Sequence, residues 1–198
     1  MANIGRPRKF DRNKALEEAM FLFWKYGYEA TSLSQLKVKM GNISSPSFYA
    51  AFESKEKLFK EACQYYVDKY FIVAEPLWNE GLSTKVAIRK VLVQSLNMQY
   101  DKGHPLGCMV SLNTVMIRLD ENQHITEILK NSRFKIHQGF IFCIQRGVDS
   151  GELISPIDSS GLATIFDSCL IGISSLAREG VEKKEIESGI NQLLTLLN

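Results

Sequence analysis

Apolar residues recur at helical spacing along this chain from residue 12 to its end, and no run alternates strictly between apolar and polar positions. The first stripe has the i, i+3, i+4, i+7 spacing of an amphipathic helix and consists of Leu16, Ala19, Met20 and Phe23. It predicts a helix from Arg12 to Tyr26 that Gly27 ends. Later stripes predict helices over about 85–98, 105–119, 125–149, 158–179 and 183–197. We therefore predict an all-α fold.

Residues 31–58 contain two short apolar stripes separated by a turn signal. Thr31 or Ser32 can cap the first helix, and Gly41-Asn42 gives the backbone freedom to reverse. A second helix opens near Ser44, and a proline in its first turn is tolerated because the early amides of a helix have no intrahelical partner. Two short helices around a tight turn are typical of a helix-turn-helix DNA reader.

Phe48 and Phe52 lie four residues apart and are expected to anchor the inner face of that second helix. Ser45, Ser47 and Tyr49 then remain outside, where they can meet bases or phosphates. The other expected contacts are Ser44, as a cap or a backbone contact, Pro46, as an apolar contact to a thymine methyl group, Thr31 and Lys55. Lys55 opens a fourth helix, where its charge and free backbone amides favour a phosphate, and Thr31 precedes the first motif helix in a similar position.

The fourth helix has Ser54 as its expected cap and ends before Pro76. Its inner face is formed by Leu58, Phe59, Ala62 and Tyr66. The helix leads out of the DNA-binding part, so we predict two domains: residues 1–58, or 10–70 with the connecting helix, and residues 59–198.

The N-terminal segment resembles the TetR-type transcriptional repressors. The resemblance is carried by Ala19, Phe23, Gly27, Tyr28, Ala30, Thr31 and Ser32, then by residues 43–49 (Ile-Ser-Ser-Pro-Ser-Phe-Tyr), Phe52, Ser54, Lys55, Glu56 and Leu58. The turn after Gly41 is one residue longer than is usual in that family, and the resemblance fades after residue 70. A Gly-Cys-Met at 107–109 is similar to a Gly-Cys-Leu in one subgroup. The resemblance implies a DNA-binding regulator with a C-terminal effector-binding domain.

Basic residues concentrate where the helix-turn-helix lies. Residues 1–60 hold 11 Lys and Arg against 6 Asp and Glu, and the remainder holds 13 against 16, although the whole chain has a net charge of only +2. This distribution is expected if the N-terminal part meets phosphates. Arg6, Arg8 and Lys9 form a short basic arm, suited to the minor groove or to phosphates unless it is simply disordered.

The last two predicted helices combine large aliphatic residues with small ones, which lets helices approach closely. They can form an intramolecular core or pack against a second copy as a four-helix bundle. The resemblance favours the second alternative, because family members dimerise through their last two helices, and a two-fold dimer suits a palindromic operator. The expected interface residues are Leu162, Phe166, Ile173, Leu176, Ile186, Ile190, Leu193, Leu194 and Leu197.

Residues 60–180 predict a large apolar, partly aromatic interior with few polar groups. Such an interior suits an apolar or amphipathic small-molecule effector, or it is ordinary core. The candidate pocket residues are Met98, Tyr100, Met109, Met116, Phe134, Phe140, Phe142 and Phe166. His104 and Cys108 are the nearest approach to a metal pair, but no third ligand accompanies them, so we expect neither a metal nor a cofactor.

Other classes of protein are disfavoured by what the sequence lacks. It has no Gly-x-Ser-x-Gly, Gly-rich phosphate loop or His-Glu-x-x-His, so an enzyme is not expected. The most apolar run, 161–177, contains Asp167 and is shorter than a membrane span, which predicts a buried or interface helix and a cytoplasmic protein without a membrane partner. The four cysteines form no Cys-x-x-Cys pair and are expected to be reduced and buried. The alternative function is a small-molecule or redox sensor whose helix-turn-helix no longer binds DNA.

Overall fold

The computed structural model describes residues 11–116, 123–154 and 156–198, and the side chains of these residues except 114–116 and 123–126. The described residues contain no strand, so the predicted all-α fold is confirmed. The elements in chain order are α1 (Arg12–Ala30), α2 (Leu33–Lys39), α3 (Ser45–Phe52), α4 (Lys55–Tyr70), the 3₁₀ helix η1 (Phe71–Trp78), α5 (Thr84–Gln99), α6 (Met109–Met116), α7 (Gln123–Asp149), α8 (Ser159–Arg178), α9 (Lys183–Leu193) and the 3₁₀ helix η2 (Leu194–Leu197).

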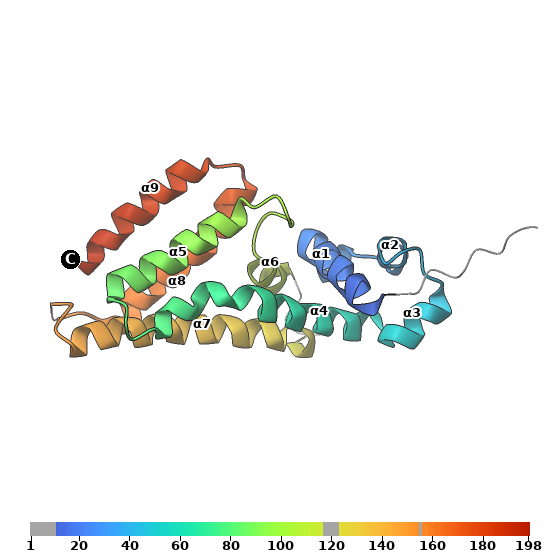
Figure 1. The fold of residues 1–198 in the computed structure, drawn as a ribbon, viewed down its shortest axis with the longest axis horizontal. Coiled ribbons are helices and arrows are strands. Elements are labelled where there is room, and N and C mark those ends of the chain that lie inside the picture. The colour runs from blue at the N-terminus through green and yellow to red at the C-terminus, as the bar shows by residue number, and fades with distance from the viewer. Residues whose placement is uncertain (1–10, 117–122, 155) are drawn as a thin grey trace, which may run out of the picture.

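The molecule is elongated, with α1, α2 and α3 at one end (Figure 1). We call these three helices the head. At the other end, α5, α8 and α9 lie together, and α4 and α7 run along the length of the molecule between the two ends and pack on each other (Figure 1). A shift in the position of α4 or α7 can therefore be transmitted to both ends of the molecule.

Serine and aspartate side chains fix where the helices of the head begin. Ser32 rather than Thr31 caps α2, and Gln35 completes a capping box by accepting from the Ser32 backbone N–H. Ser54 caps α4, as predicted, and Ser44 caps α3, which was one of the two roles expected for it. The Asp11 carboxylate accepts from two backbone amides at the start of α1.

Gly27 interrupts α1 three residues before its end. Its φ of 80° and ψ of 170° lie outside the helical region and are readily adopted only by glycine. The predicted break is therefore present, although a short helical segment follows it to Ala30. Just beyond, the Thr31 hydroxyl donates to the Gly27 carbonyl at 2.7 Å, and Thr31 is fully buried.

One predicted helix start is wrong. The helix expected from residue 105 begins at Met109, because Pro105 and Gly107, with a φ of +89°, hold the preceding segment in an irregular conformation. The prediction that the fourth helix ends before Pro76 is confirmed, since α4 ends at Tyr70 and the proline lies in the 3₁₀ helix η1 that follows it.

Two hydrophobic cores follow one another along the molecule. The first contains the buried aromatic side chains of the head, and it extends along α4 to Tyr66 and onto Met109 and Val110 of α6 and Leu129 of α7. The second lies between η1, α5, α7, α8 and α9. Packing of the head therefore continues past residue 58, and the division into 1–58 and 59–198 stays a prediction.

Within the part of the chain that the structure describes, α8 is the one helix that is long and apolar enough to cross a membrane. This finding rests on length and composition, and the core helix of a soluble protein meets the same criterion. The exposed apolar side chains of α8 bear on assembly and are described below.

Candidate DNA interface and effector cavity

The turn between α2 and α3 uses two successive residues in the left-handed region. Gly41 has a φ of +94° and Asn42 a φ of 60°. The turn is closed by backbone bonds from Asn42 to the Val38 carbonyl at 3.1 Å and from Ile43 to the Lys37 carbonyl at 3.1 Å. These bonds satisfy carbonyls at the end of α2, so the longer turn is an ordered connection that fixes the direction of α3.

Helix α3 presents one buried face and one exposed edge. Phe48 and Phe52 are almost completely buried, as predicted, and they hold α3 against the head. The exposed edge consists of Pro46, Ser47, Tyr49 and Ala50, and the Tyr49 side chain is 51% exposed. A short helix anchored by aromatic residues on one side and open on the other has the form of a recognition helix.

The serines at the start of α3 are already engaged with their neighbours. The Ser44 hydroxyl accepts from the Ser47 backbone N–H at 3.3 Å, so Ser44 is the cap. Ser45 is half-buried, and its hydroxyl accepts from the Lys37 ammonium at 2.9 Å. The sequence reasoning missed Lys37, which lies on α2 and brings a positive charge to the edge of α3.

Two of the predicted DNA contacts have a different environment from the one expected. Thr31 is buried and its hydroxyl is bonded within the head, so it is not part of the exposed surface. The Lys55 ammonium lies 4.3 Å from the centre of the Tyr28 ring. Burial lowers the pKa of Lys55, opposed by the carboxylate of Glu29. The predicted arm residues Arg6, Arg8 and Lys9 lie outside the described residues.

Arg12 positions the C-terminal end of α3 and was not predicted to do so. Its guanidinium lies 4.7 Å from the centre of the Phe52 ring, donates to the Ala51 carbonyl at 3.3 Å, and forms an ion pair with Glu61 at 2.7 Å. These contacts join the first turn of α1 to the end of α3 and to α4. The sequence shows that Arg12 follows the cap residue of the first helix, but it does not show which residues of α3 and α4 the guanidinium contacts. This role of Arg12 therefore could not be predicted.

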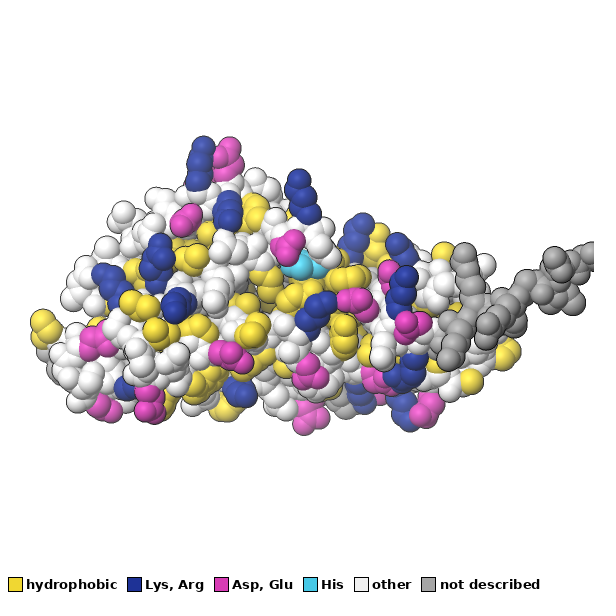
Figure 2. All heavy atoms as spheres, in the orientation of Figure 1, with side chains coloured by type: hydrophobic (Ala, Val, Ile, Leu, Met, Phe, Trp, Pro, Cys, Tyr) yellow, Lys and Arg dark blue, Asp and Glu magenta, His cyan; other side chains and the backbone are white. Residues whose placement is uncertain are grey.

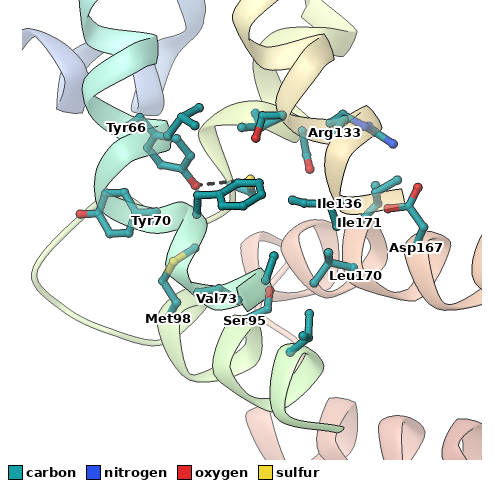
Figure 3. Close-up of a pocket in the computed structure, with 18 of the residues that line it drawn as sticks. Tyr66, Tyr70, Val73, Ser95, Met98, Arg133, Ile136, Asp167, Leu170 and Ile171 are labelled. Carbon is teal, nitrogen blue, oxygen red and sulfur yellow. Dashed lines mark hydrogen bonds between the residues drawn. The ribbon is translucent and has the colours of Figure 1, made fainter. Parts of the chain in front are cut away.

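A cavity lies between α4, η1, α5, α7 and α8, and the segment 108–111 closes one side. Figure 3 shows Tyr66 and Tyr70 from α4, Ser95 and Met98 from α5, and Arg133 and Asp167 from α7 and α8 around it. The space open to the centres of water-sized molecules is ≈ 80 Å³, and the lining is mainly apolar. Typical ligand pockets measure roughly 300–1,000 Å³, so this cavity suits a small ligand.

Met98 is the one predicted pocket residue whose described side chain lines this cavity. Met109, Phe140 and Phe166 are buried in the two cores instead, and Phe134 and Phe142 are 65% and 42% exposed. Tyr100 is half-buried and its hydroxyl donates to the Val181 carbonyl. The side chain of Met116 falls outside the described residues. Periodicity identified apolar positions, but helix packing decides which of them face a cavity.

Several cavity residues were missed because they are polar. The Tyr66 hydroxyl donates to the Cys108 Sγ at 3.4 Å (Figure 3), and burial raises the pKa of Tyr66 well above its usual value. The Asp167 carboxylate lies 3.4 Å from His137 Nδ1. Burial raises the pKa of Asp167, opposed by Arg133 and then by His137. The sequence contained one signal for a polar cavity lining: Ser95 and Gln99 interrupt the apolar stripe of α5.

Residues 104–113, which include the segment that closes the cavity, also bind the head. The Trp24 indole N–H of α1 donates to the Gly107 carbonyl at 2.8 Å, and its ring stacks on His104 at 4.5 Å. Asn113 of α6 is fully buried and accepts from the Tyr28 backbone N–H at 3.2 Å. The cavity and α1 are therefore joined through residues 104–113 as well as through α4.

The cysteines are unpaired, and their environments differ. Burial raises the pKa of Cys63, and it raises that of Cys143 to about 11, opposed by Arg146. Both thiols are thus disfavoured as nucleophiles. Cys108 is half-buried, lines the cavity and accepts from Tyr66. No group of three metal-ligating residues occurs in the ranges that the structure describes.

Six of the nine predicted interface residues are packed in the core of their own chain. These are Phe166, Ile173, Ile186, Ile190, Leu194 and Leu197. The physical reason is that α9 packs its apolar stripe against α5 and α8 of the same chain. Leu162 and Leu193 are half-buried, and Leu176 is 40% exposed.

An apolar groove remains open between α8 and α9. It is lined by Cys169, Leu176 and Leu193 and by the two glycines Gly172 and Gly189. A Cβ atom at either glycine would meet nothing within 4 Å, so the surface there is open. By contrast, the face in Figure 2 carries interspersed basic and acidic side chains at the head end.

A head with a helix-turn-helix and an exposed second helix, joined by a long helix to a helical part with an apolar cavity, defines a DNA-binding regulator. Comparison with known proteins agrees with this class. Residues 15–62 match the family model described as bacterial regulatory proteins, tetR family. The chain is 34% identical over 185 residues to the HTH-type transcriptional repressor ComR of Escherichia coli K12, covering 92% of this chain and 86% of ComR.

The solved structures that resemble this chain include one bound to DNA. It is a cysteine mutant of the TetR family transcriptional regulator CifR in complex with 26-bp double-strand operator DNA. Its TM-score is 0.86 with 31% identity, and the match covers 98% of this chain and 100% of that one. The reduced form of Escherichia coli NemR, at 17% identity and a TM-score of 0.75, shows the same fold. The chain therefore belongs to the TetR family of transcriptional regulators, and it is not an enzyme.

Proposed function

We propose that this regulator is a repressor that binds a palindromic operator as a homodimer and is released by a small molecule bound in the cavity beside α4. The observation that carries the proposal is the exposed edge of α3, held outward by the buried Phe48 and Phe52. ComR is named a repressor and CifR was solved with operator DNA, which supports the same activity in this chain.

The proposed DNA surface consists of the edge of α3 and the start of α4. Tyr49, Pro46 and Ser47 meet base edges and sugars, and the basic side chains of Lys37 and Lys55 neutralise phosphates. The arm formed by Arg6, Arg8 and Lys9 reaches phosphates or the minor groove beside the site. The regulator acts in the cytoplasm, where its DNA lies.

The proposed homodimer buries the groove between α8 and α9. The groove is apolar, contains two glycines that permit close approach, and includes the exposed Leu176. Ile165, 45% exposed on α8, extends the apolar area that a second copy would cover. A two-fold axis through this groove presents two heads to the two half-sites of a palindrome.

Release by the effector follows from the two connections between the cavity and the head. A ligand contacts Tyr66 and Tyr70 on α4 and the segment that begins at Cys108. Gly107 and Asn113, which flank that segment, are bonded to α1. A ligand that favours another position of α4 or of this segment changes the tilt of each head, so the spacing of the two α3 helices no longer matches the half-sites.

The test of the DNA surface begins with the wild-type protein and a pool of random-sequence DNA duplexes. Repeated selection should enrich a palindromic duplex, and binding to it should weaken steeply with salt because phosphate contacts release counterions. Replacement of Tyr49 by Ala should then weaken binding to that duplex by about ten-fold, the loss expected for about 1.4 kcal/mol of lost contact.

The matched control is Tyr26→Ala. Tyr26 is an exposed tyrosine of α1, 42% exposed, so its replacement is the same chemical change away from α3. We expect the control to bind the selected duplex as the wild type does. Equal affinity of the two variants would remove Tyr49 from the surface, and failure to enrich any duplex would refute DNA binding itself.

A further inference from the structure

Gln99 places a buried polar group without a partner at the cavity. It is the last residue of α5, its side chain is 1% exposed, and it lines the cavity. Its Oε1 atom is buried and has no hydrogen-bond partner among the residues that the structure describes. Buried amide groups are nearly always hydrogen-bonded, so this exception indicates a place where a ligand supplies the missing bond.

The charged residues that line the cavity are Arg133 and Asp167. Gln99 follows Met98 on α5, and Figure 3 shows Met98 and Tyr70 on the side of the cavity opposite Arg133 and Asp167. The two charged residues lie close together, and Asp167 also pairs with His137 at 3.4 Å. The cavity is therefore mainly apolar at one end and carries a roughly balanced set of charges at the other.

These surroundings select a chemical class of ligand. A charged group beside Gln99 would lose its hydration without gaining an opposite charge. A pure hydrocarbon would leave the buried amide unpaired. A hydroxyl group can both donate and accept, so it can bond to Gln99 whichever way the side-chain amide is turned.

We propose that the effector is a small, uncharged, mainly apolar alcohol or phenol whose hydroxyl group bonds to the side-chain amide of Gln99. The inference deepens the proposed effector-responsive function and rests on it. The apolar part of the ligand lies against Val91, Met98 and Leu170, and the size of the cavity, ≈ 80 Å³, favours a single ring or a short chain. A hydroxyl group at this position also lies at the C-terminal end of α5, where the chain enters the segment that holds Trp24.

The test compares p-cresol with p-xylene, two compounds of nearly equal shape that differ in a hydroxyl and a methyl group. Dissociation constants are measured on the full chain by ligand-observed NMR, in the absence of DNA. The wild type should bind p-cresol at least about ten-fold more tightly than p-xylene, because only p-cresol supplies a partner for the buried amide. p-Toluate, which places a carboxylate at the same position, should bind more weakly than p-cresol.

Gln99→Leu should abolish the preference, because the variant has no amide to satisfy, and p-xylene should bind it as well as p-cresol does. Gln138→Leu is the matched control, since Gln138 is exposed on α7 and its replacement should leave the wild-type preference unchanged. Equal binding of the two compounds by the wild type, binding of neither, or a preference that survives in Gln99→Leu would each overturn the inference.

The comparison of ligands within the wild type needs no variant, so a folding defect of Gln99→Leu does not decide the result. Because the titrations contain no DNA, they fail or succeed separately from the duplex selection. A preference for p-cresol together with no selected duplex would keep the ligand assignment and refute the proposed function. A selected duplex without any preference would do the reverse.

Discussion

Replacing Asn113 by Ala should loosen the junction between the head and α6. Asn113 is fully buried, its Oδ1 accepts from the Tyr28 backbone N–H at 3.2 Å, and its Nδ2 donates to the Met109 carbonyl at 2.9 Å. The Tyr28 N–H follows Gly27, where the backbone leaves the helical path, so its partner is the side chain of another helix. Alanine cannot supply that acceptor.

The size of the expected loss of stability follows from the Tyr28 backbone N–H, which has no acceptor in the variant. An unsatisfied buried donor costs about 1–3 kcal/mol, and the Tyr28 N–H is only partly buried, which places the loss in the lower half of that range. The void left by the amide adds to this loss. We expect a decrease of about 2 kcal/mol in the free energy of unfolding, which a domain with a stability of about 5–15 kcal/mol survives.

Urea denaturation gives the change in stability, and hydrogen exchange gives its location. The Tyr28 amide should exchange faster in Asn113→Ala than in the wild type, whereas amides of α9 should be unaffected by the local opening. Asn97→Ala, on the exposed face of α5, is the matched control and should be close to neutral. A loss below about 0.5 kcal/mol with unchanged exchange at Tyr28 would refute the reasoning, because surface substitutions alone produce changes of that size.

Two further substitutions test the assembly and the charge in the cavity. Leu176→Asp should yield monomers in analytical ultracentrifugation, because it places a charge in the α8–α9 groove. Leu196 lies outside that groove and is 49% exposed, so Leu196→Asp is the control and should remain a dimer. A dimer that survives Leu176→Asp would place the contact elsewhere. Asp167→Asn should raise stability at pH 7, because partial burial raises the pKa of the carboxyl group above its usual value of 3.8 and the ionised form therefore opposes folding. This advantage should shrink as the pH falls through the raised pKa, and it should vanish below 3.8, where the carboxyl group is protonated in both states. A pH-independent difference in urea denaturation would contradict the assignment.

The helices were predictable because each needs only local information. Apolar spacing, the caps at Ser44 and Ser54, and the glycine at position 27 act through bonds and contacts within a few residues. The anchoring of α3 by Phe48 and Phe52 follows from the same spacing, since residues four apart share one face of a helix. The boundary at residue 105 failed because Pro105 and Gly107, with its φ of +89°, hold the segment before Met109 in an irregular conformation.

The candidate site was less predictable because it depends on how distant helices meet. The sequence offered Thr31 as a DNA contact, but the fold directs its hydroxyl to the Gly27 carbonyl. It offered Phe140 and Phe166 for the cavity, and the two rings stack in the core at 6.3 Å instead. Gln99 and Asp167 were not predicted to line the cavity, because a single sequence does not show which polar side chains a neighbouring helix will cover.

By itself, the sequence determined the all-helical fold, the helix-turn-helix and the family, since these depend on local spacing and on motifs read in register. Only the tertiary structure decided which apolar residues enclose the cavity, which stay exposed between α8 and α9, and that residues 104–113 join the cavity to α1. The physical reason is that the spacing of apolar residues within one helix determines which face of that helix is buried. Which other helix covers that face depends on the packing of all the helices together.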